Sequence, residues 1–346
     1  MNTKELLEAL NSLPYPGLSR TLGELKLISE VKVTDNQASI ELLTVSDDSY
    51  PSVKSAIEEA FLKYFSSMNI TKKATVKKDI NYGNSATPNN RAPYAANVIA
   101  VTSGKGGVGK STVSVNLAIA LAQKGYRVGI LDADLYGPNI PRLTNTDLEK
   151  IKWNDDNKIV PSENYGIKIM SVALTTPTSD TPLVWRSSVA VSALIQFLED
   201  VAWGELDFLV IDMPPGTGDI QLTMAQELPI TAGVIVTTPQ LVASDDVSRS
   251  IRMFQDIHVP MAGLVENMSY FIAPDTGTRY DIFGTGGGER LCARYNIPLL
   301  GQIPLNMAIR EGSDNGEPPV VLGDESLKSY YRDIVENMFK SVKFRV

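Results

Sequence analysis

Short, nearly continuous runs of apolar residues recur along the larger, C-terminal part of the chain. Each is rich in Val, Ile and Leu, and helical stretches such as residues 111–125 lie between them. Such runs are typical of strands buried on both faces of a parallel sheet, with helices as crossovers. We therefore expect an α/β fold with a doubly wound, mostly parallel sheet and ligands at the carboxyl ends of its strands. The expected strands are NVIAVT, RVGILDAD, DFLVIDM, AGVIVTT, AGLVENM and PLLGQIP, which begin at residues 97, 127, 207, 232, 262 and 298.

A different pattern occupies the first 80 residues, where helical and strand-like segments are shorter and more polar. Asn2 and Glu5 have the spacing of a capping box, ahead of four leucines on one helical face. The expected elements are a helix at 2–13, strands at 27–33 and 38–45, a helix at 52–65 and a strand around 74–78. We therefore predict a small α/β domain over 1–80, a linker rich in Asn, Pro, Ala and Gly over 81–96, and the second domain over 97–346.

Composition narrows the function. The 346 residues are 43% hydrophobic and 21% charged, as in ordinary globular proteins, and carry a net charge of -8, which disfavours broad binding to nucleic acid. Cys292 is the only cysteine, so one chain can form neither a disulfide nor a multi-thiolate site. The N-terminus does not resemble a signal peptide, and no apolar run approaches the length of a membrane span. We expect a cytoplasmic protein.

The most specific motif matches G-x-x-x-x-G-K-[ST], a phosphate-binding loop. It follows an expected strand and opens an expected helix, so backbone N–H groups and a helix N-terminus would converge on phosphate oxygens. Lys110 would contact the β and γ phosphates of ATP, and the Ser111 hydroxyl would ligate Mg²⁺. The expected nucleotide-binding residues are Gly104, Lys105, Gly106, Gly107, Val108, Gly109, Lys110, Ser111 and Thr112.

Acidic residues follow two other strands. Asp132 and Asp134 end the run RVGILDAD, and a carboxylate there can orient a water molecule for in-line attack on the γ-phosphorus. Helix capping or turn formation is the alternative for either residue alone. Asp212 ends FLVID in the position of a Walker B acid, which would hold Mg²⁺, and the loop MPPGTGD after it could sense the γ-phosphate.

Lys105 is a second lysine inside the loop, and with it the chain resembles the signature-lysine (deviant Walker A) ATPases. The segments VTSGKGGVGKST, LDADLYGPNIPRL, IDMPPGTGD, TTPQ and GLVENMSYF resemble the Mrp (ApbC-like) iron-sulfur cluster carriers within that family, and the N-terminal domain resembles a MIP18-type domain. The resemblance implies ATP hydrolysis in a homodimer, with Lys105 reaching the nucleotide of the other subunit. It also implies that Asp134 positions the water, Asp132 supports the loop and metal, and Asn267 contacts adenine. Iron-sulfur scaffold or client apoproteins are the implied partners.

One departure affects the implied [4Fe-4S] cluster. Family members usually have C-x-x-C after ENMSYF, whereas this chain has Ala273-Pro274-Asp275-Thr276. We expect Cys292 to be a small buried residue, not a ligand. Three possibilities stay open: cluster binding through other ligands, thiolates contributed by a partner, or an ATPase switch that holds no iron.

Two other functions remain open from the sequence. A MinD- or ParA-type organiser would use ATP-driven dimerisation to bind a surface, and the amphipathic C-terminal segment could attach it to a membrane, although a docked helix is the simpler interpretation. A small-molecule kinase would also use a phosphate-binding loop, but Lys105 and the loop after Asp212 argue against it.

Overall fold

The computed structural model describes residues 2–14, 21–23, 28–34, 36–42, 50–72, 90–135, 137–175 and 187–345. The chain divides into two compact units, residues 1–86 and 87–346. They are described separately below.

In its described residues, the smaller unit contains a three-stranded sheet and two α-helices. α1 (Thr3–Asn11) begins at the expected capping box: Asn2 Oδ1 accepts from Glu5 N at 3.0 Å and Glu5 Oε2 from Asn2 N at 2.9 Å. β2 pairs antiparallel with β1 and parallel with β3. Leucines of α1 and isoleucines of β2 and α2 form its core. The remaining elements are β1 (Ile28–Thr34), β2 (Gln37–Leu42), α2 (Tyr50–Phe61) and β3 (Ser67–Lys72).

Two details of this unit differ from expectation. α2 ends at Phe61 instead of residue 65, because a 3-10 turn, Leu62–Tyr64, follows. The third strand is β3, where Ile70 is buried; residues 74–78, where a strand was expected, lie outside the described residues. The MIP18-type assignment and the boundaries 1–80 and 81–96 stay predictions, and residues 81–89 also lie outside the described part.

The larger unit contains an eight-stranded sheet in the order β15-β12-β11-β4-β10-β5-β9-β8. Every neighbouring pair is parallel except β8 and β9. The doubly wound, mostly parallel fold is confirmed, and all six expected strands belong to this sheet, whereas β8 and β9 were not predicted. The strands are β4 (Ala95–Ser103), β5 (Val128–Asp132), β8 (Ser162–Asn164), β9 (Ile167–Ser171), β10 (Leu206–Asp212), β11 (Ala232–Thr237), β12 (Met261–Glu266) and β15 (Leu299–Gln302).

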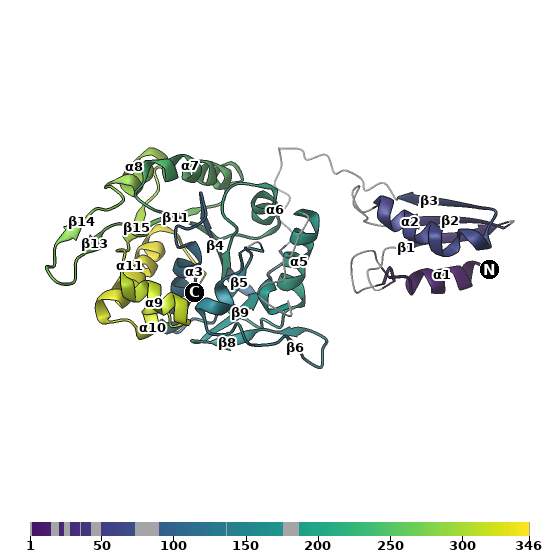
Figure 1. The fold of residues 1–346 in the computed structure, drawn as a ribbon, viewed down its shortest axis with the longest axis horizontal. Coiled ribbons are helices and arrows are strands. Elements are labelled where there is room, and N and C mark those ends of the chain that lie inside the picture. The colour runs from purple at the N-terminus through teal and green to yellow at the C-terminus, as the bar shows by residue number, and fades with distance from the viewer. Residues whose placement is uncertain are drawn as a thin grey trace. The chain divides into compact units, whose positions relative to one another are not determined.

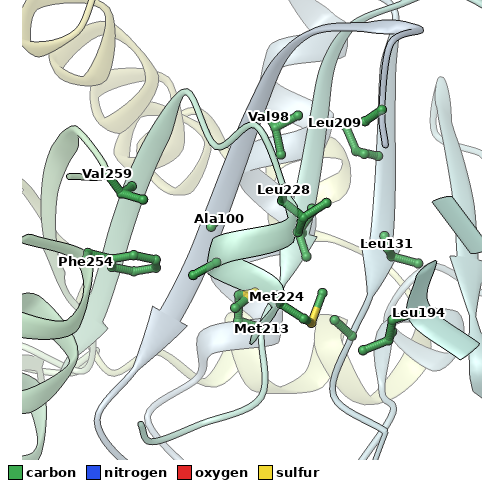
Figure 2. Close-up of a cluster of buried hydrophobic side chains, with 14 of the residues drawn as sticks. Val98, Ala100, Leu131, Leu194, Leu209, Met213, Met224, Leu228, Phe254 and Val259 are labelled. Atoms are coloured by element: carbon green, nitrogen blue, oxygen red, sulfur yellow. The ribbon is translucent and has the colours of Figure 1, made fainter. Parts of the chain in front are cut away.

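Helices cover both faces of this sheet (Figure 1). One apolar cluster joins the sheet to α3 (Lys110–Gln123), α4 (Ile140–Leu143), α10 (Pro319–Leu322) and α11 (Glu325–Ser341). The other joins it to α5 (Ser187–Asp200), α6 (Asp219–Glu227), α7 (Leu241–Asp256) and α8 (Gly287–Tyr295). Figure 2 shows part of this second cluster, including Leu194, Met224 and Phe254. Smaller elements are β6 (Lys152–Trp153), β7 (Ile159–Val160), β13 (Phe271–Ile272), β14 (Arg279–Tyr280), a 3-10 turn (Val172–Thr175) and α9 (Met307–Asn315), which packs on α4.

The C-terminal helix is part of the core. The apolar face of α11 packs against β15 and α3 and buries Tyr331, Ile334, Val335 and Met338. Beyond the helix, Asn97 on β4 accepts from the backbone N–H of Arg345 and donates to its carbonyl, both at 2.9 Å. Among the described residues, no helix combines the length and apolar character that crossing a membrane requires.

Candidate functional site

Strand register brings two of the expected acids together. β5 and β10 are hydrogen-bonded neighbours, and Asp132 pairs with Asp212 at their last position. On the other side of β5, Asp132 pairs with Ser171 of β9. Both carboxylates are fully buried. The sheet therefore presents two adjacent acids at its carboxyl edge, where an α/β fold binds ligands.

The phosphate-binding loop lies directly above this pair, between the end of β4 and the start of α3. Gly107 and Gly109 have φ values of 79° and 81°, in the left-handed region that glycine adopts readily. Gly109 also faces Asn267 at the end of β12, where an added Cβ would overlap the amide nitrogen. That nitrogen donates to Val108 O at 2.8 Å. Asn267 therefore holds the phosphate-binding loop through its hydrogen bond to Val108.

Lys110 and Ser111 meet at one carboxylate. Asp212 Oδ2 lies 2.8 Å from Lys110 Nζ and 2.6 Å from Ser111 Oγ, while its Oδ1 accepts from Ser114 Oγ at 2.6 Å. Burial lowers the pKa of Lys110, but the charges of Asp212 and Asp134 outweigh burial, so the net shift is upward. The ammonium group is therefore held in its charged form within the site.

Asp132 and Asp134 differ in surroundings. Asp132 is enclosed: its Oδ1 accepts from Asp134 N at 3.2 Å, and its Oδ2 accepts from Ile140 N at 3.2 Å and Ser171 Oγ at 3.0 Å. Asp134 is partly exposed, with its Oδ2 3.6 Å from Lys110 Nζ. Burial raises the pKa of both carboxyls, and Lys110 opposes the rise. Asp132 thus fixes the segment that carries Asp134.

These residues surround an open cavity of about 330 Å³. Most of the expected loop residues line it, together with Asp134. The expected site residues that do not line it are Gly104, Val108, Asp132, Asp212 and Asn267. Asp132 and Asp212 are connected to lining residues by the hydrogen bonds and ion pair described above, and Asn267 is bonded to Val108 within the loop. The lining residues are Ser103, Lys105, Gly106, Gly107, Gly109, Lys110, Ser111, Thr112, Asp134, Asn139, Arg142, Leu143, Pro215, Ser313 and Asp314.

Lys105 lies on the wall of this cavity and is half-buried. Its Nζ donates to Gln240 Oε1 at 3.0 Å, and its carbonyl accepts from Ser103 Oγ at 2.9 Å. Gln240 is the N-cap residue of α7. In this structure the signature lysine is therefore bound within its own chain.

The loop after Asp212 is tied to the loop after β4. Gly216, with φ of 93°, donates its N–H to Ser103 O at 2.8 Å, and Gln221 Nε2 donates to Pro215 O at 2.6 Å. Pro215 itself lines the cavity. A conformational change in the loop after Asp212 would therefore alter contacts next to the phosphate-binding loop.

Five polar residues of the cavity were not singled out from the sequence. Ser103 is the last residue of β4, directly before the loop motif. Asn139 and Arg142 lie in the segment LYGPNIPRL, where a cation eight residues after Asp134 was the available signal. Ser313 and Asp314 come from α9, and Ser313 Oγ lies 3.4 Å from Thr112 Oγ1. No local pattern marked α9, because only tertiary packing brings it to the loop.

The positions that replace C-x-x-C form a turn. Residues 273–278 connect β13 to β14, with Ala273 N donating to Thr278 O at 2.9 Å and Gly277 N to Ala273 O at 2.8 Å. Cys292 lies in α8 and is 9% exposed, as expected. Burial, together with Glu266 and Glu289, raises the pKa of its thiol to about 11. Within the described ranges, no group of three His, Cys, Asp or Glu side chains is placed to hold a metal ion.

Comparison with known proteins identifies the family. The model of the ParA family, described as NUBPL iron-transfer P-loop NTPase, matches residues 94–339. An iron-sulfur cluster carrier protein of Deinococcus radiodurans is 42% identical over 93% of this chain and 90% of its own length, and one of Escherichia coli K12 is 40% identical over 95% and 89%. A third, of Aquifex aeolicus, is 47% identical over 68% of this chain and 65% of its own length.

Two solved structures are similar to the larger part of this chain. A nucleotide-binding protein from Archaeoglobus fulgidus, solved in complex with ADP, is 37% identical, with a TM-score of 0.61 over 70% of this chain and 94% of that chain. The cell division ATPase MinD of Pyrococcus furiosus, at 22% identity and a TM-score of 0.53 over 71% of this chain and 99% of that chain, shares the fold. With its phosphate-binding loop, paired strand-end acids and nearly full-length relatives, the chain belongs to the ParA/NUBPL family of iron-transfer P-loop NTPases.

Proposed function

We propose that the chain binds ATP with Mg²⁺ in the cavity at the carboxyl edge of its sheet and hydrolyses it slowly. The observation that carries this proposal is the convergence of Lys110 Nζ and Ser111 Oγ on one oxygen of Asp212. A lysine for the β and γ phosphates, a hydroxyl for the metal and a strand-end carboxylate behind both form the machinery of a P-loop NTPase.

The donors fit Mg²⁺, which prefers oxygen ligands and is usually shared between a protein and the phosphates of its substrate. Ser111 and Asp212 would hold it, and Asp132 would support it from the next strand. The carboxyl groups of Asp212, Asp132 and Asp134 surround the single ammonium group of Lys110. When bound, Mg²⁺ supplies charge neutralisation at the phosphates.

Asp134 is the residue that we propose orients the attacking water. Its carboxylate faces the cavity, whereas Asp132 and Asp212 are enclosed behind it. Asp132 holds the backbone N–H of Asp134, which limits the freedom of the carboxylate. For Asn267 we keep the proposed adenine contact: the bond to Val108 uses one of its two N–H donors.

We further propose that hydrolysis requires a homodimer in which Lys105 reaches the nucleotide of the other subunit. Lys105 is half-buried on the cavity wall, and its amine is bound by a neutral amide that it can leave at small cost. A cation supplied in trans stabilises charge on the transferred phosphoryl group, as an arginine finger does.

We propose that ATP binding and hydrolysis drive the transfer of iron-sulfur clusters, which are the cargo of the chain. The iron-sulfur cluster carrier proteins of Deinococcus radiodurans and Escherichia coli match almost the whole chain. Since residues 273–276 lack cysteine and Cys292 is buried, the thiolates that hold the cluster would come from scaffold or client proteins. We place this activity in the cytoplasm.

Anaerobic incubation with ferrous iron and sulfide, followed by iron analysis of the desalted protein, tests the cargo proposal. We expect the native chain alone to retain no cluster and Ala273→Cys with Thr276→Cys to gain one. A control with the same number of cysteines in a different spacing, Ala273→Cys with Asp275→Cys, should gain less. Retention by the native chain and equally by Cys292→Ser would show that other ligands of this chain hold the cluster.

A second assay tests the transfer step. A scaffold protein loaded with a [4Fe-4S] cluster is mixed with an apo-ferredoxin, and transfer is followed with and without the native chain and MgATP. Acceleration that requires both supports the proposal. If the rate is the same without the chain, the role in transfer is wrong even where ATP hydrolysis is intact. A membrane-organising role has no comparable support, because the apolar face of α11 is buried in the core.

A further inference from the structure

Arg142 is a cation of the cavity to which the machinery described above gives no role. Its side chain is exposed and lines the cavity together with Lys105 and Lys110. The two carboxylates of the lining have other partners: Asp134 faces Lys110 at 3.6 Å, and Asp314 pairs with Arg310 at 2.9 Å. Within the described part of the chain, no carboxylate lies within ion-pair distance of Arg142.

The backbone of Arg142 is fixed. Its neighbours Pro141 and Leu143 are buried, and its carbonyl accepts from Asn145 N at 3.3 Å. Gly316, with φ of 69°, packs so closely on this carbonyl that an added Cβ would lie 2.7 Å from it. A side chain that starts from a rigid backbone pays less entropy when it is ordered by a ligand. The backbone of Arg142 is therefore held in place in the way that favours ligand binding by its side chain.

Asp132 connects this mount to the reaction. Its carboxylate accepts from the backbone N–H groups of Asp134 and Ile140, the first residue of α4. The same buried acid thus holds both the water-orienting residue and the short helix that carries Arg142. Their spacing is set by one anchor, so Arg142 keeps a defined position relative to the phosphates.

The charges in the cavity indicate a function for Arg142. The ammonium group of Lys110 is engaged by Asp212 and Asp134, so two carboxylates already face one lysine before any phosphate enters. ATP brings a strongly negative tail, and backbone N–H groups of the loop carry only partial charges. A guanidinium group offers several N–H donors in a fixed plane that matches phosphate oxygens.

We infer that Arg142 binds the phosphate chain of the nucleotide from the cavity wall formed by α4. This inference rests on the proposed binding of ATP and adds a binding residue to it. It makes Arg142 responsible for affinity toward the phosphates and not for the choice of base. The guanidinium group balances charge that Lys110 cannot.

The test compares Arg142→Gln and Arg142→Lys with the native chain by calorimetry with MgATP, MgADP and MgGTP. Arg142→Gln should weaken MgATP and MgADP about 10- to 100-fold, as expected for charge-assisted hydrogen bonds, with an unchanged ratio of ATP to GTP affinity. Arg142→Lys should recover part of the loss. Arg332→Gln, which removes a half-exposed arginine from α11, is the matched control and should bind as the native chain does.

The outcomes separate the two proposals. If the native chain binds MgATP and Arg142→Gln binds it within about twofold, or Arg332→Gln loses as much, the inference is wrong while ATP binding stands. A changed base preference in Arg142→Gln also overturns it. If the native chain does not bind MgATP, both proposals fail. Equal melting temperatures of ligand-free Arg142→Gln and native protein exclude misfolding as the cause of a loss.

Discussion

Lys105 Nζ is bound to Gln240 Oε1 of the same chain across 3.0 Å. Gln240 occupies the N-cap position of α7. This helix packs so closely against the start of the phosphate-binding loop that a side chain at Gly104 would overlap the backbone of Asp246 and Val247. The lysine and its acceptor are thus carried by two segments in direct contact. A lysine that acts on a neighbouring subunit has to leave this acceptor first.

Lys105→Ala should therefore separate binding from hydrolysis. We expect nearly native affinity for MgATP and a fall in phosphate release of about 10³-fold or more, the scale of a missing cation in trans. Lys124→Ala, which removes a lysine at the C-cap position of α3, is the control. Native turnover by Lys105→Ala would show that the second lysine of the loop is not catalytic.

Gln240→Ala should have the opposite effect at low protein concentration. Removing the acceptor frees Lys105 from a hydrogen bond that contributes about 1 kcal/mol, so turnover should rise up to about fivefold. At high protein concentration, where dimers predominate, the difference should disappear. Phosphate release measured over a dilution series checks this, and equal rates at every dilution would contradict it.

Gly109 and Gly106 form a matched pair for the stability of the loop. Gly109→Ala places a Cβ against Asn267 at a residue with φ of 81°, whereas Gly106 has no atom within 4 Å of an added Cβ. We expect Gly109→Ala to lower the free energy of unfolding by about 2 kcal/mol or more and Gly106→Ala to change it little. Urea denaturation of the ligand-free proteins measures both. Equal stabilities would show that the loop relaxes around the clash.

Cys292 predicts a pH dependence. Because its thiol has a pKa of about 11 in the folded chain and about 8.5 when unfolded, folding favours the protonated form. Its contribution to stability is complete below about pH 8.5 and is lost as the pH rises toward 11. Thiol titration with Ellman's reagent at pH 8 should be slow in the native protein and fast in urea. Fast labelling of the folded chain would show that Cys292 is a reactive thiol.

The sequence was most informative where local pattern and function coincide. The six apolar runs became neighbouring strands because their lack of alternation reflects burial on both faces, and the loop motif lies between β4 and α3 as expected. Asp132 and Asp212 could be predicted at the site because each ends a strand of a parallel sheet. The family resemblance, drawn from Lys105 and the other motifs, is confirmed by the matched family model.

Tertiary packing decided what the sequence did not show. β9 joins the sheet beside β5 although its lysine at 168 interrupts the apolar run, because Lys168 Nζ reaches Trp203 O at 2.6 Å. The adenine contact of Asn267 stays a prediction, whereas its bond to Val108 could not be predicted, because it depends on where β12 ends relative to the loop. The residues of α9 line the cavity only through tertiary packing, with Ser313 Oγ 3.4 Å from Thr112 Oγ1.

Because Asp132 pairs with Asp212, the nucleotide site forms only when β5 and β10 are paired in the correct register. Successive side chains of a strand point to opposite faces, so a slip of β5 by a single residue would turn one acid away from the other. A misassembled sheet could keep its helices and its apolar core and still be unable to grip a metal-nucleotide complex. Recovery of nucleotide binding after refolding therefore reports strand alignment that circular dichroism does not detect.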